Sequence, residues 1–305
     1  MITALFGFGR AGKIHYHNLK DYNLEYVVEL IDVSEQINTA SYIDFNDKIS
    51  INQMLKQIDV AIITTPTSTH YQLIMLCLKN NVHVFVEKPI VDDYHQINQC
   101  FDLAEKNNLK LMVGYNRRFD PILMNIKKEI DQGKIGNVNT ALTISRDYPY
   151  PKPEYMAISG GIFHDCATHD IDYMNWILDS KPTKVMVTVN ETNHDYCFDH
   201  TVVTLTYPKT IATLHLSRIS QSYDQRCEFY GDLGEIRNNN YNPEVIASFP
   251  ERYAIAFKNE IEYFFNCIEN NVELSITREH CLINHIISDC CQKSVVESKI
   301  IDIKY

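Results

Sequence analysis

Short apolar runs alternate with longer amphipathic stretches over residues 1–118 of the chain. This alternation predicts β-α-β units, in which helices join the strands of a parallel sheet. The apolar runs are nearly continuous, as expected for strands that helices cover on both faces. The predicted strands cover residues 2–7, 25–32, 59–65, 82–87 and 110–115.

The rest of the chain has a different pattern. Val185, Val187 and Val189 alternate with Met186 and Thr188, which predicts a strand with one buried face. Comparable runs predict a mainly antiparallel open sheet. Its expected strands cover residues 139–148, 184–191, 200–208, 210–219 and 225–231.

The two patterns together predict an α/β protein of two domains. Residues 1–118 form the first domain, and residues 119–305 form a second α/β domain around the open sheet. Amphipathic helices at 251–271 and 277–293 are assigned to the second domain.

The composition is that of a globular protein and argues against nucleic-acid and membrane proteins. Hydrophobic residues make up 45% of the chain and charged residues 22%, as in ordinary globular proteins. The formal net charge of -11 argues against binding to nucleic acid or to an anionic membrane. No apolar run is long enough to span a bilayer, and Met1 leads directly into the first predicted strand, so we expect no signal peptide.

The cysteines indicate a reducing compartment. There are nine and none forms a CxxC motif, while Cys77 and Cys267 lie within apolar helical patterns. This favours free thiols, with the adjacent Cys290 and Cys291 chemically inert. We therefore expect a cytoplasmic protein.

A glycine-rich motif, GFGRAG at residues 7–12, lies between the first predicted strand and a helix. In this context GxGxxG predicts a dinucleotide-binding Rossmann domain, with an ordinary glycine turn as the alternative. The free N–H groups at the helix N-terminus suit the pyrophosphate. The expected cofactor contacts in this loop are Gly7, Phe8, Gly9, Arg10, Ala11 and Gly12.

The cofactor expected at this loop is NAD. Asp32 ends the second predicted strand, where a carboxylate accepts hydrogen bonds from the adenine ribose diol. Residues 33–35 supply no Arg or Lys for the 2′-phosphate of NADP.

Two further loops follow predicted strands of the same domain. TTPTSTH at 64–70 begins a helix, so helix capping alone explains it as well as cofactor binding does. In the second loop, EKPI, Glu87 and Lys88 stand at the carboxyl edge of the predicted sheet, where ligands bind; an ordinary surface lysine is the alternative. The expected cofactor contacts in these loops are Thr65, Pro66, Thr67, His70, Glu87 and Lys88.

The segment GGIFHDCATHDID at 160–172 carries the clearest candidate chemistry. Asp165, His169 and Asp172 are spaced by four and three residues, so a regular helix places them on one face. The alternative is that these residues form a solvent-exposed polar face without a catalytic role. Such a set also suits zinc or manganese, but no HExxH or cysteine cluster accompanies it and Lys88 would repel a cation, so we expect no metal.

Two arginines lie at the end of the first predicted domain, within the motif GYNRRFDP. Arg117 and Arg118 follow a strand of the parallel sheet and lie near its ligand-binding edge. We expect Arg117 to contact the substrate, with domain packing as the alternative role.

These motifs together identify a family. GFGRAGKIH, TTPTSTH, EKP, GYNRRFDP and GGIFHDCATHDID resemble, in this order, the motifs of the Gfo/Idh/MocA sugar and polyol oxidoreductases. The resemblance covers nearly the whole chain and is closest to the inositol dehydrogenases. It implies a Rossmann domain followed by an α/β domain whose open sheet forms the interface of a homodimer or homotetramer.

The resemblance also implies roles for individual residues. Lys88, Asp165 and His169 match the catalytic positions of the family. Tyr223 matches a position near the polyol, and Asp172 matches an acid whose role is substrate contact or support; either Asp165 or Asp172 supports the imidazole of His169. His164 departs from the subgroup pattern, with an effect on substrate choice or none.

The expected reaction follows from these residue types. His169 accepts the proton of a carbinol hydroxyl, Asp165 orients the imidazole or binds the substrate, and Lys88 stabilises the developing alkoxide. We therefore expect an NAD-dependent dehydrogenase that oxidises a secondary alcohol of inositol or a related cyclic polyol to the ketone. The alternatives are a sugar or nucleotide-sugar dehydrogenase of the same family, or a non-catalytic regulator that binds the dinucleotide.

Overall fold

The structure is a computed structural model that describes residues 1–31, 33–149, 151–152, 155–156, 159–190, 200–238 and 248–305. It divides into two compact units: Met1–Tyr115 with Phe257–Cys281, and Asn116–Ala256 with Leu282–Tyr305. The prediction of a single boundary at residue 118 thus misses the return of 257–281 to the first unit. An amphipathic helix does not reveal in its sequence which sheet it will cover.

A six-stranded parallel sheet forms the first unit, in the order β3-β2-β1-β4-β5-β6. This is the strand order of dinucleotide-binding domains, so the predicted Rossmann fold is confirmed. The strands are β1 (Thr3–Phe6), β2 (Leu24–Glu29), β3 (Ser41–Asp44), β4 (Val60–Ile63), β5 (His83–Glu87) and β6 (Leu111–Gly114).

Two details of this sheet differ from the prediction. β3 is not among the predicted strands, because this four-residue edge strand is only partly buried and so lacks a continuous apolar run. The second strand ends at Glu29 rather than at residue 32, and Leu30 and Ile31 are 58% and 74% exposed. An apolar run therefore overstates the length of this strand.

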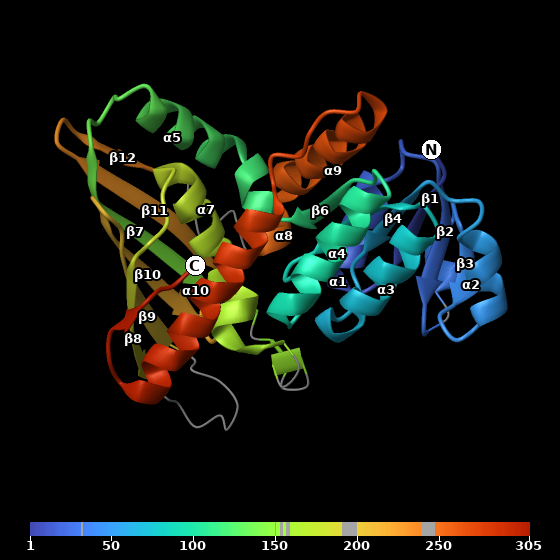
Figure 1. The fold of residues 1–305 in the computed structure, drawn as a ribbon, viewed down its shortest axis with the longest axis horizontal. Helices are drawn as coiled ribbons and strands as arrows, with labels where there is room; N and C mark the ends of the chain where they lie inside the picture. The colour runs from blue at the N-terminus through green and yellow to red at the C-terminus, as the bar shows by residue number, and fades with distance from the viewer. Residues whose placement is uncertain (32, 150, 153–154, 157–158, 191–199, 239–247) are drawn as a thin grey trace. The chain divides into compact units, whose positions relative to one another are not determined.

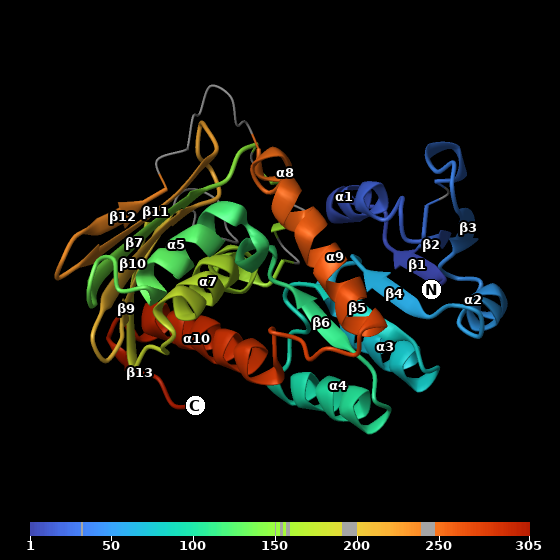
Figure 2. The same ribbon diagram turned by 90° about the horizontal axis from the view of Figure 1, so that it is seen from above.

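Helices cover both faces of the parallel sheet (Figure 2). α1 (Arg10–Asn18) and α9 (Ala254–Glu269) share one face, where His15 and Phe264 both contact the ring of Phe85. α3 (Thr67–Lys79) and α4 (Tyr94–Lys106) cover the opposite face. Right-handed crossovers produce this arrangement, because the connections run in opposite directions from the centre of the sheet. The links η1 (Ser34–Gln36) and α2 (Lys48–Met54) lead into and out of β3.

A seven-stranded mixed sheet forms the second unit, in the order β12-β11-β7-β10-β9-β8-β13. Only β7 and β10 pair in parallel and the other described pairs are antiparallel, which confirms the predicted mainly antiparallel sheet. The strands are β7 (Val138–Arg146), β8 (Lys184–Asn190), β9 (His200–Thr206), β10 (Ile211–Ser217), β11 (Asp224–Gly231), β12 (Glu235–Arg237) and β13 (Ile301–Asp302).

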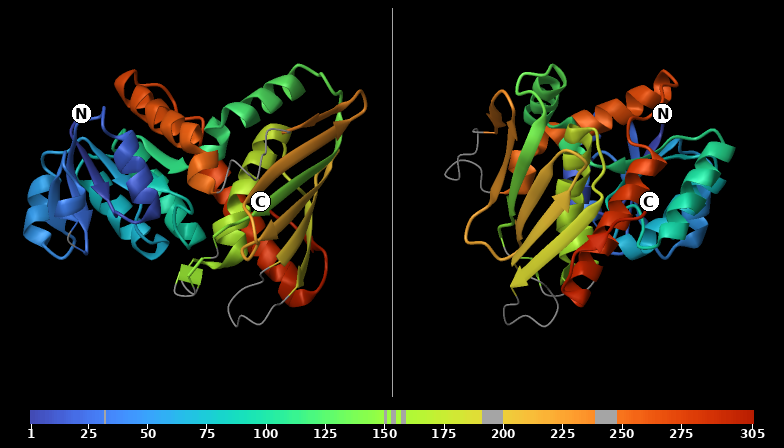
Figure 3. Two further views of the ribbon diagram at one scale, coloured as in Figure 1. Left: turned by 180° about the vertical axis from the view of Figure 1, so that it is seen from behind. Right: turned by 60° about the vertical axis from the view of Figure 1, so that its left-hand side comes forward.

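Helices pack on one face of this mixed sheet (Figures 1 and 3). They are α5 (Pro121–Asp131), α7 (Thr168–Leu178) and α10 (Arg278–Glu297), with the short turn η3 (Phe163–Ala167) directly before α7. Two further short turns, η2 (Asn116–Phe119) and α8 (Phe249–Arg252), precede α5 and α9 in the chain. Met174, Ile287 and Leu214 are fully buried between helices and sheet. On the other face Met186 and Ile211 are 45% and 51% exposed. Among the described residues, no helix is both long and apolar enough to cross a lipid bilayer.

Candidate active site

The glycine loop between β1 and α1 is packed tightly on one side and open on the other. Gly7 has φ +91°, and a Cβ there would lie 2.9 Å from backbone atoms of Thr64 and Thr65. A Cβ on Gly12 would lie 2.3 Å from the carbonyl oxygen of Gly7. A Cβ on Gly9, by contrast, would meet nothing within 4 Å. The open side at Gly9 and the N-terminus of α1 therefore fit a dinucleotide pyrophosphate.

The carboxylate of Glu29, at the end of β2, accepts a backbone hydrogen bond from this loop. Phe8 N donates to Glu29 Oε2 at 2.6 Å, and Leu30 N donates to Oε1 at 2.7 Å. Glu29 is not among the predicted site residues, although an acid at the end of the second strand is a recognised signal. Asp32 lies outside the described residues, so its contact with the ribose stays a prediction.

His70 joins the loop after β4 to the loop after β5. Its ring is 1% exposed, with Nδ1 2.9 Å from the carbonyl oxygen of Pro89 and Nε2 2.8 Å from that of Thr65. Burial lowers the pKa of His70, so the imidazole is neutral at pH 7. The structure thus gives this ring a role in joining two loops instead of the predicted cofactor contact. The roles of Thr65, Pro66 and Thr67 stay predictions.

Lys88 directly follows β5 at the carboxyl edge of the parallel sheet, where open α/β sheets bind ligands. The Lys88–Pro89 peptide bond is cis. The preceding Glu87 was predicted to bind the cofactor, but its Oε1 lies 2.7 Å from His15 Nε2 and its side chain is 12% exposed. Glu87 therefore binds a helix of its own unit, and the catalytic role of Lys88 stays a prediction.

The helical segment of the second unit is not a regular α-helix. Phe163–Ala167 form a π-helical turn that continues directly into α7, so Asp165 lies in the wide turn and His169 in the regular helix. The prediction that Asp165, His169 and Asp172 share one face assumed 3.6 residues per turn throughout, and the π turn changes that angle. Such turns occur frequently at functional sites.

A buried arginine anchors Asp165. Arg218 is 1% exposed, and its NH2 group donates to Asp165 Oδ2 at 2.7 Å and to Ser159 Oγ at 3.0 Å. The hydroxyl of Tyr155 donates to Asp165 Oδ1 at 3.0 Å. Both carboxylate oxygens of Asp165 thus accept charged or polar hydrogen bonds, which stabilise its anionic form.

We expect Arg218→Leu to lower the free energy of unfolding by about 3–5 kcal/mol, because it leaves the buried Asp165 carboxylate without its cation. Urea denaturation measures this change. Arg146→Leu is the matched control, since Arg146 is 48% exposed and its pair with Asp224 spans 3.7 Å. Adding Asp165→Asn to the Arg218 variant should restore part of the loss; no restoration would mean that the arginine stabilises the fold through packing alone.

Arg117 does not have an open position for a substrate. Its NH1 group lies 3.0 Å from Asp170 Oδ1, and its guanidinium lies 5.5 and 5.4 Å from the ring centroids of Tyr173 and Tyr253. Burial is the largest single influence and opposes the charge of Arg117, but Asp170 and the neighbouring tyrosines together outweigh it and raise the pKa of Arg117. The structure therefore favours the packing role over the predicted substrate contact.

Asp172 is also paired with a charged residue of the same unit. It is 2% exposed, and its two oxygens accept hydrogen bonds from Arg118 Nε at 2.8 Å and NH2 at 2.7 Å. This bidentate pair joins η2 to α7 and supports the helix that carries His169. Support, and not substrate contact, is the role that this geometry favours.

The contact of Tyr223 with a polyol stays a prediction, but its surroundings are unusual. It is 2% exposed, and its hydroxyl makes no hydrogen bond within the described part of the chain. Burial, with Tyr253 nearby, raises the pKa of Tyr223, so the hydroxyl keeps its proton. A buried hydroxyl without a partner is costly unless a ligand or water supplies one.

His164, which departs from the family pattern, faces helix α10. Its Nε2 lies 3.0 Å from Asp289 Oδ1, and its ring lies 5.1 Å from that of His285. These contacts assign His164 to packing between the π turn and α10.

The comparisons with known proteins agree with this architecture. A model described as an oxidoreductase family with an NAD-binding Rossmann fold matches residues 1–115, and the GFO/IDH/MocA C-terminal domain matches 123–237. An inositol 2-dehydrogenase of Rhizobium meliloti is 31% identical over 98% of each chain. NAD is thereby confirmed as the cofactor class.

Two solved structures share the fold over almost their full lengths. A myo-inositol dehydrogenase from Corynebacterium glutamicum has 28% identity and a TM-score of 0.86, covering 100% of this chain and 99% of that one. A scyllo-inositol dehydrogenase from Lactobacillus casei, with bound NAD(H) and scyllo-inositol, has 26% identity and a TM-score of 0.87, covering 99% and 98%. The chain therefore belongs to the Gfo/Idh/MocA family of oxidoreductases.

Proposed function

We propose that this protein is an NAD-dependent dehydrogenase that oxidises a secondary hydroxyl of inositol, or of a related cyclic polyol, to the ketone. The observation that supports this most strongly is full-length similarity to inositol dehydrogenases, combined with a lysine at the carboxyl edge of the NAD-binding sheet. Relatives with bound NAD(H) and inositol support the same substrate class.

The proposed chemistry uses three side chains. His169 accepts the hydroxyl proton, because an imidazole can do so at neutral pH. Asp165, held anionic by Arg218, orients the imidazole or binds a substrate hydroxyl. Lys88 stabilises the negative charge that develops on the carbinol oxygen.

Further residues bind the two reactants. The open side of the glycine loop at Gly9 receives the pyrophosphate of NAD, and bound NAD supplies the hydride acceptor. The hydroxyl of Tyr223, which has no partner among the described residues, gives a polyol hydroxyl a buried hydrogen-bond partner. A polyol that fills this position would also exclude water from the reacting carbon.

A panel of substrates tests the proposal. Purified protein is mixed with NAD at alkaline pH and with myo-inositol, scyllo-inositol, monosaccharides or nucleotide sugars, and NADH formation is followed by absorbance. We expect the inositols to be oxidised fastest. Faster oxidation of a sugar or nucleotide sugar would show that the substrate is not a cyclic polyol. NAD binding without oxidation of any of these compounds would favour a non-catalytic regulator.

We also propose a homo-oligomer, a dimer or tetramer, assembled through the uncovered face of the mixed sheet. Strands β8 and β10 expose Met186 and Ile211 there, and exposed apolar residues on an uncovered sheet face favour association. Light scattering of wild-type protein and of a Met186→Lys, Ile211→Lys variant tests this proposal. A monomeric wild type, or an unchanged mass in the variant, would contradict it.

The proposed location is the cytoplasm. Every cysteine in the described part of the chain is a free thiol, as expected in a reducing compartment. Cell fractionation with an antibody to the native protein tests this.

A further inference from the structure

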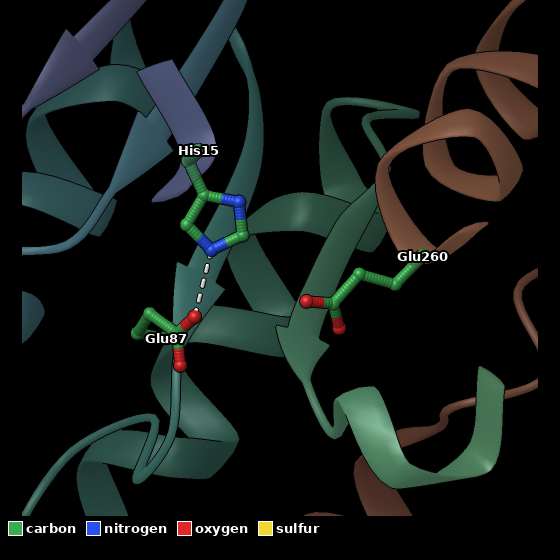
Figure 4. Close-up of side chains that lie close together, drawn as sticks. All are labelled: His15, Glu87 and Glu260. Atoms are coloured by element: carbon green, nitrogen blue, oxygen red, sulfur yellow. Dashed lines mark hydrogen bonds and ion pairs between the residues drawn. The ribbon is translucent and has the colours of Figure 1, made fainter. Parts of the chain in front are cut away.

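Three titratable side chains form a buried cluster at the end of β5, the strand that directly precedes Lys88 in the sequence (Figure 4). His15 comes from α1, Glu87 from the end of β5 and Glu260 from α9, and all three belong to the first unit. One potential ligand atom from each lies within 4.8 Å of the others. His15 and Glu260 are fully buried.

Glu260 is the anomalous member of this cluster. Both of its carboxylate oxygens are buried, and neither makes a hydrogen bond with the described residues. Its carboxyl group points toward Glu87 and His15 in Figure 4. An ionised carboxylate in this position would lose its hydration without compensation and would repel Glu87. The group therefore needs either a cation or a proton.

The geometry argues against a metal ion between the three side chains. His15 Nε2 and Glu87 Oε1 lie 2.7 Å apart, the distance of a charge-assisted hydrogen bond. Two ligands of one tetrahedral zinc ion, each about 2.0–2.1 Å from the metal, would lie about 3.4 Å apart. Among the described residues, the titratable groups that share this cluster with Glu260 are His15 on α1 and Glu87 on β5, and neither makes a hydrogen bond to it, which leaves a proton to neutralise it.

We propose that Glu260 is a protonated carboxylic acid that donates its O–H to the carboxylate of Glu87, directly or through one water. His15 already donates to Oε1 of Glu87, and the remaining lone pairs of this carboxylate can accept from Glu260. Two donors from separate helices then fix Glu87, the residue directly before Lys88. Glu260 thus acts as a positioning residue for Lys88, an inference that rests on the proposed function of that lysine.

The neutral acid has a consequence for stability. Burial, together with the charge of Glu87, raises the pKa of Glu260 well above its ordinary value. The folded protein therefore holds a proton that the unfolded chain releases near its ordinary pKa of about 4.3. Stability from this group is fully present below that pH and is lost as the pH rises toward the folded pKa.

Glu260→Gln tests the inference, because glutamine copies the size and the donor of the neutral acid but binds no proton. The difference in melting temperature between Glu260→Gln and wild type should grow in favour of the variant as pH rises from 5 to 8. Glu262→Gln, an exposed position on the same helix, is the control and should show no such trend. An infrared carbonyl band of a protonated carboxylic acid should be present in wild type and absent from Glu260→Gln.

Kinetics and metal analysis complete the test. Glu260→Gln should retain most of kcat, whereas Glu260→Leu should lose about tenfold or more in kcat with KM for NAD little changed. Equal losses in both variants, or a stoichiometric metal that disappears in Glu260→Gln, would overturn the inference. If wild type oxidises no polyol, the proposed function fails, while the melting and infrared measurements still decide the protonation of Glu260.

Discussion

Replacing Lys88 with alanine should lower kcat for polyol oxidation by about 10²–10³-fold while changing the dissociation constant for NAD by less than about threefold. One preorganised charge aimed at a developing oxyanion has an effect of this size on turnover. The lysine stands at the carboxyl edge of the sheet, whereas the pyrophosphate site belongs to the glycine loop at the end of β1. Steady-state kinetics and calorimetric titration with NAD measure the two quantities.

Two further variants sharpen the interpretation of Lys88. Lys79→Ala removes an exposed lysine from the last turn of α3 and should leave both quantities unchanged. Lys88→Arg keeps the charge but donates from a larger planar group, so we expect an intermediate kcat. Parallel losses of turnover and NAD affinity in Lys88→Ala would assign this residue to cofactor binding, and an unchanged kcat would remove it from the reaction.

Adding one methyl group to the glycine loop should have opposite consequences at two neighbouring positions. Gly12→Ala places a Cβ 2.3 Å from the carbonyl oxygen of Gly7, so the loop and α1 must separate. We expect a loss of about 3 kcal/mol in the free energy of unfolding and at least about 100-fold in NAD affinity. Thermal denaturation and NAD titration measure these losses.

Gly9→Ala is the matched partner, because its Cβ meets nothing within 4 Å and its φ of -69° is open to any residue. The fold should keep its stability to within about 1 kcal/mol, as expected for a tolerated glycine replacement. NAD should nevertheless bind at least about tenfold more weakly, because the methyl group occupies the open side of the loop. Normal NAD affinity in Gly9→Ala would place the pyrophosphate elsewhere.

The sequence was informative where a function depends on a local pattern. The glycine motif, its position between β1 and α1, and the placement of Lys88 after β5 all follow from short segments whose strand periodicity is unambiguous. The error in β2 shows the limit of this reasoning. Leu30 and Ile31 continue an apolar run, yet they lie outside the strand and are exposed.

The partners of the charged residues could not be read in the same way. Arg117 and Asp172 have the residue types of substrate ligands, but Asp170 and Arg118 pair with them in the folded chain. A charge in a sequence has many potential partners, and only the three-dimensional approach of distant segments selects one. Arg218 shows the same limit: its contact with Asp165 spans 53 residues.

By itself, the sequence determined the class of the protein: a parallel sheet with a dinucleotide loop, a mainly antiparallel second sheet, and candidate acid-base residues on a helix. Local periodicity and turn chemistry specify such features. Only the tertiary structure decided which charged side chains pair with other residues of the chain and are therefore not open to a ligand. It also showed that Asp165 lies in a π turn and that Glu260 is buried beside Glu87. Burial and ion pairing are properties of the packed chain, since desolvation and Coulomb energies depend on neighbours that are remote in sequence.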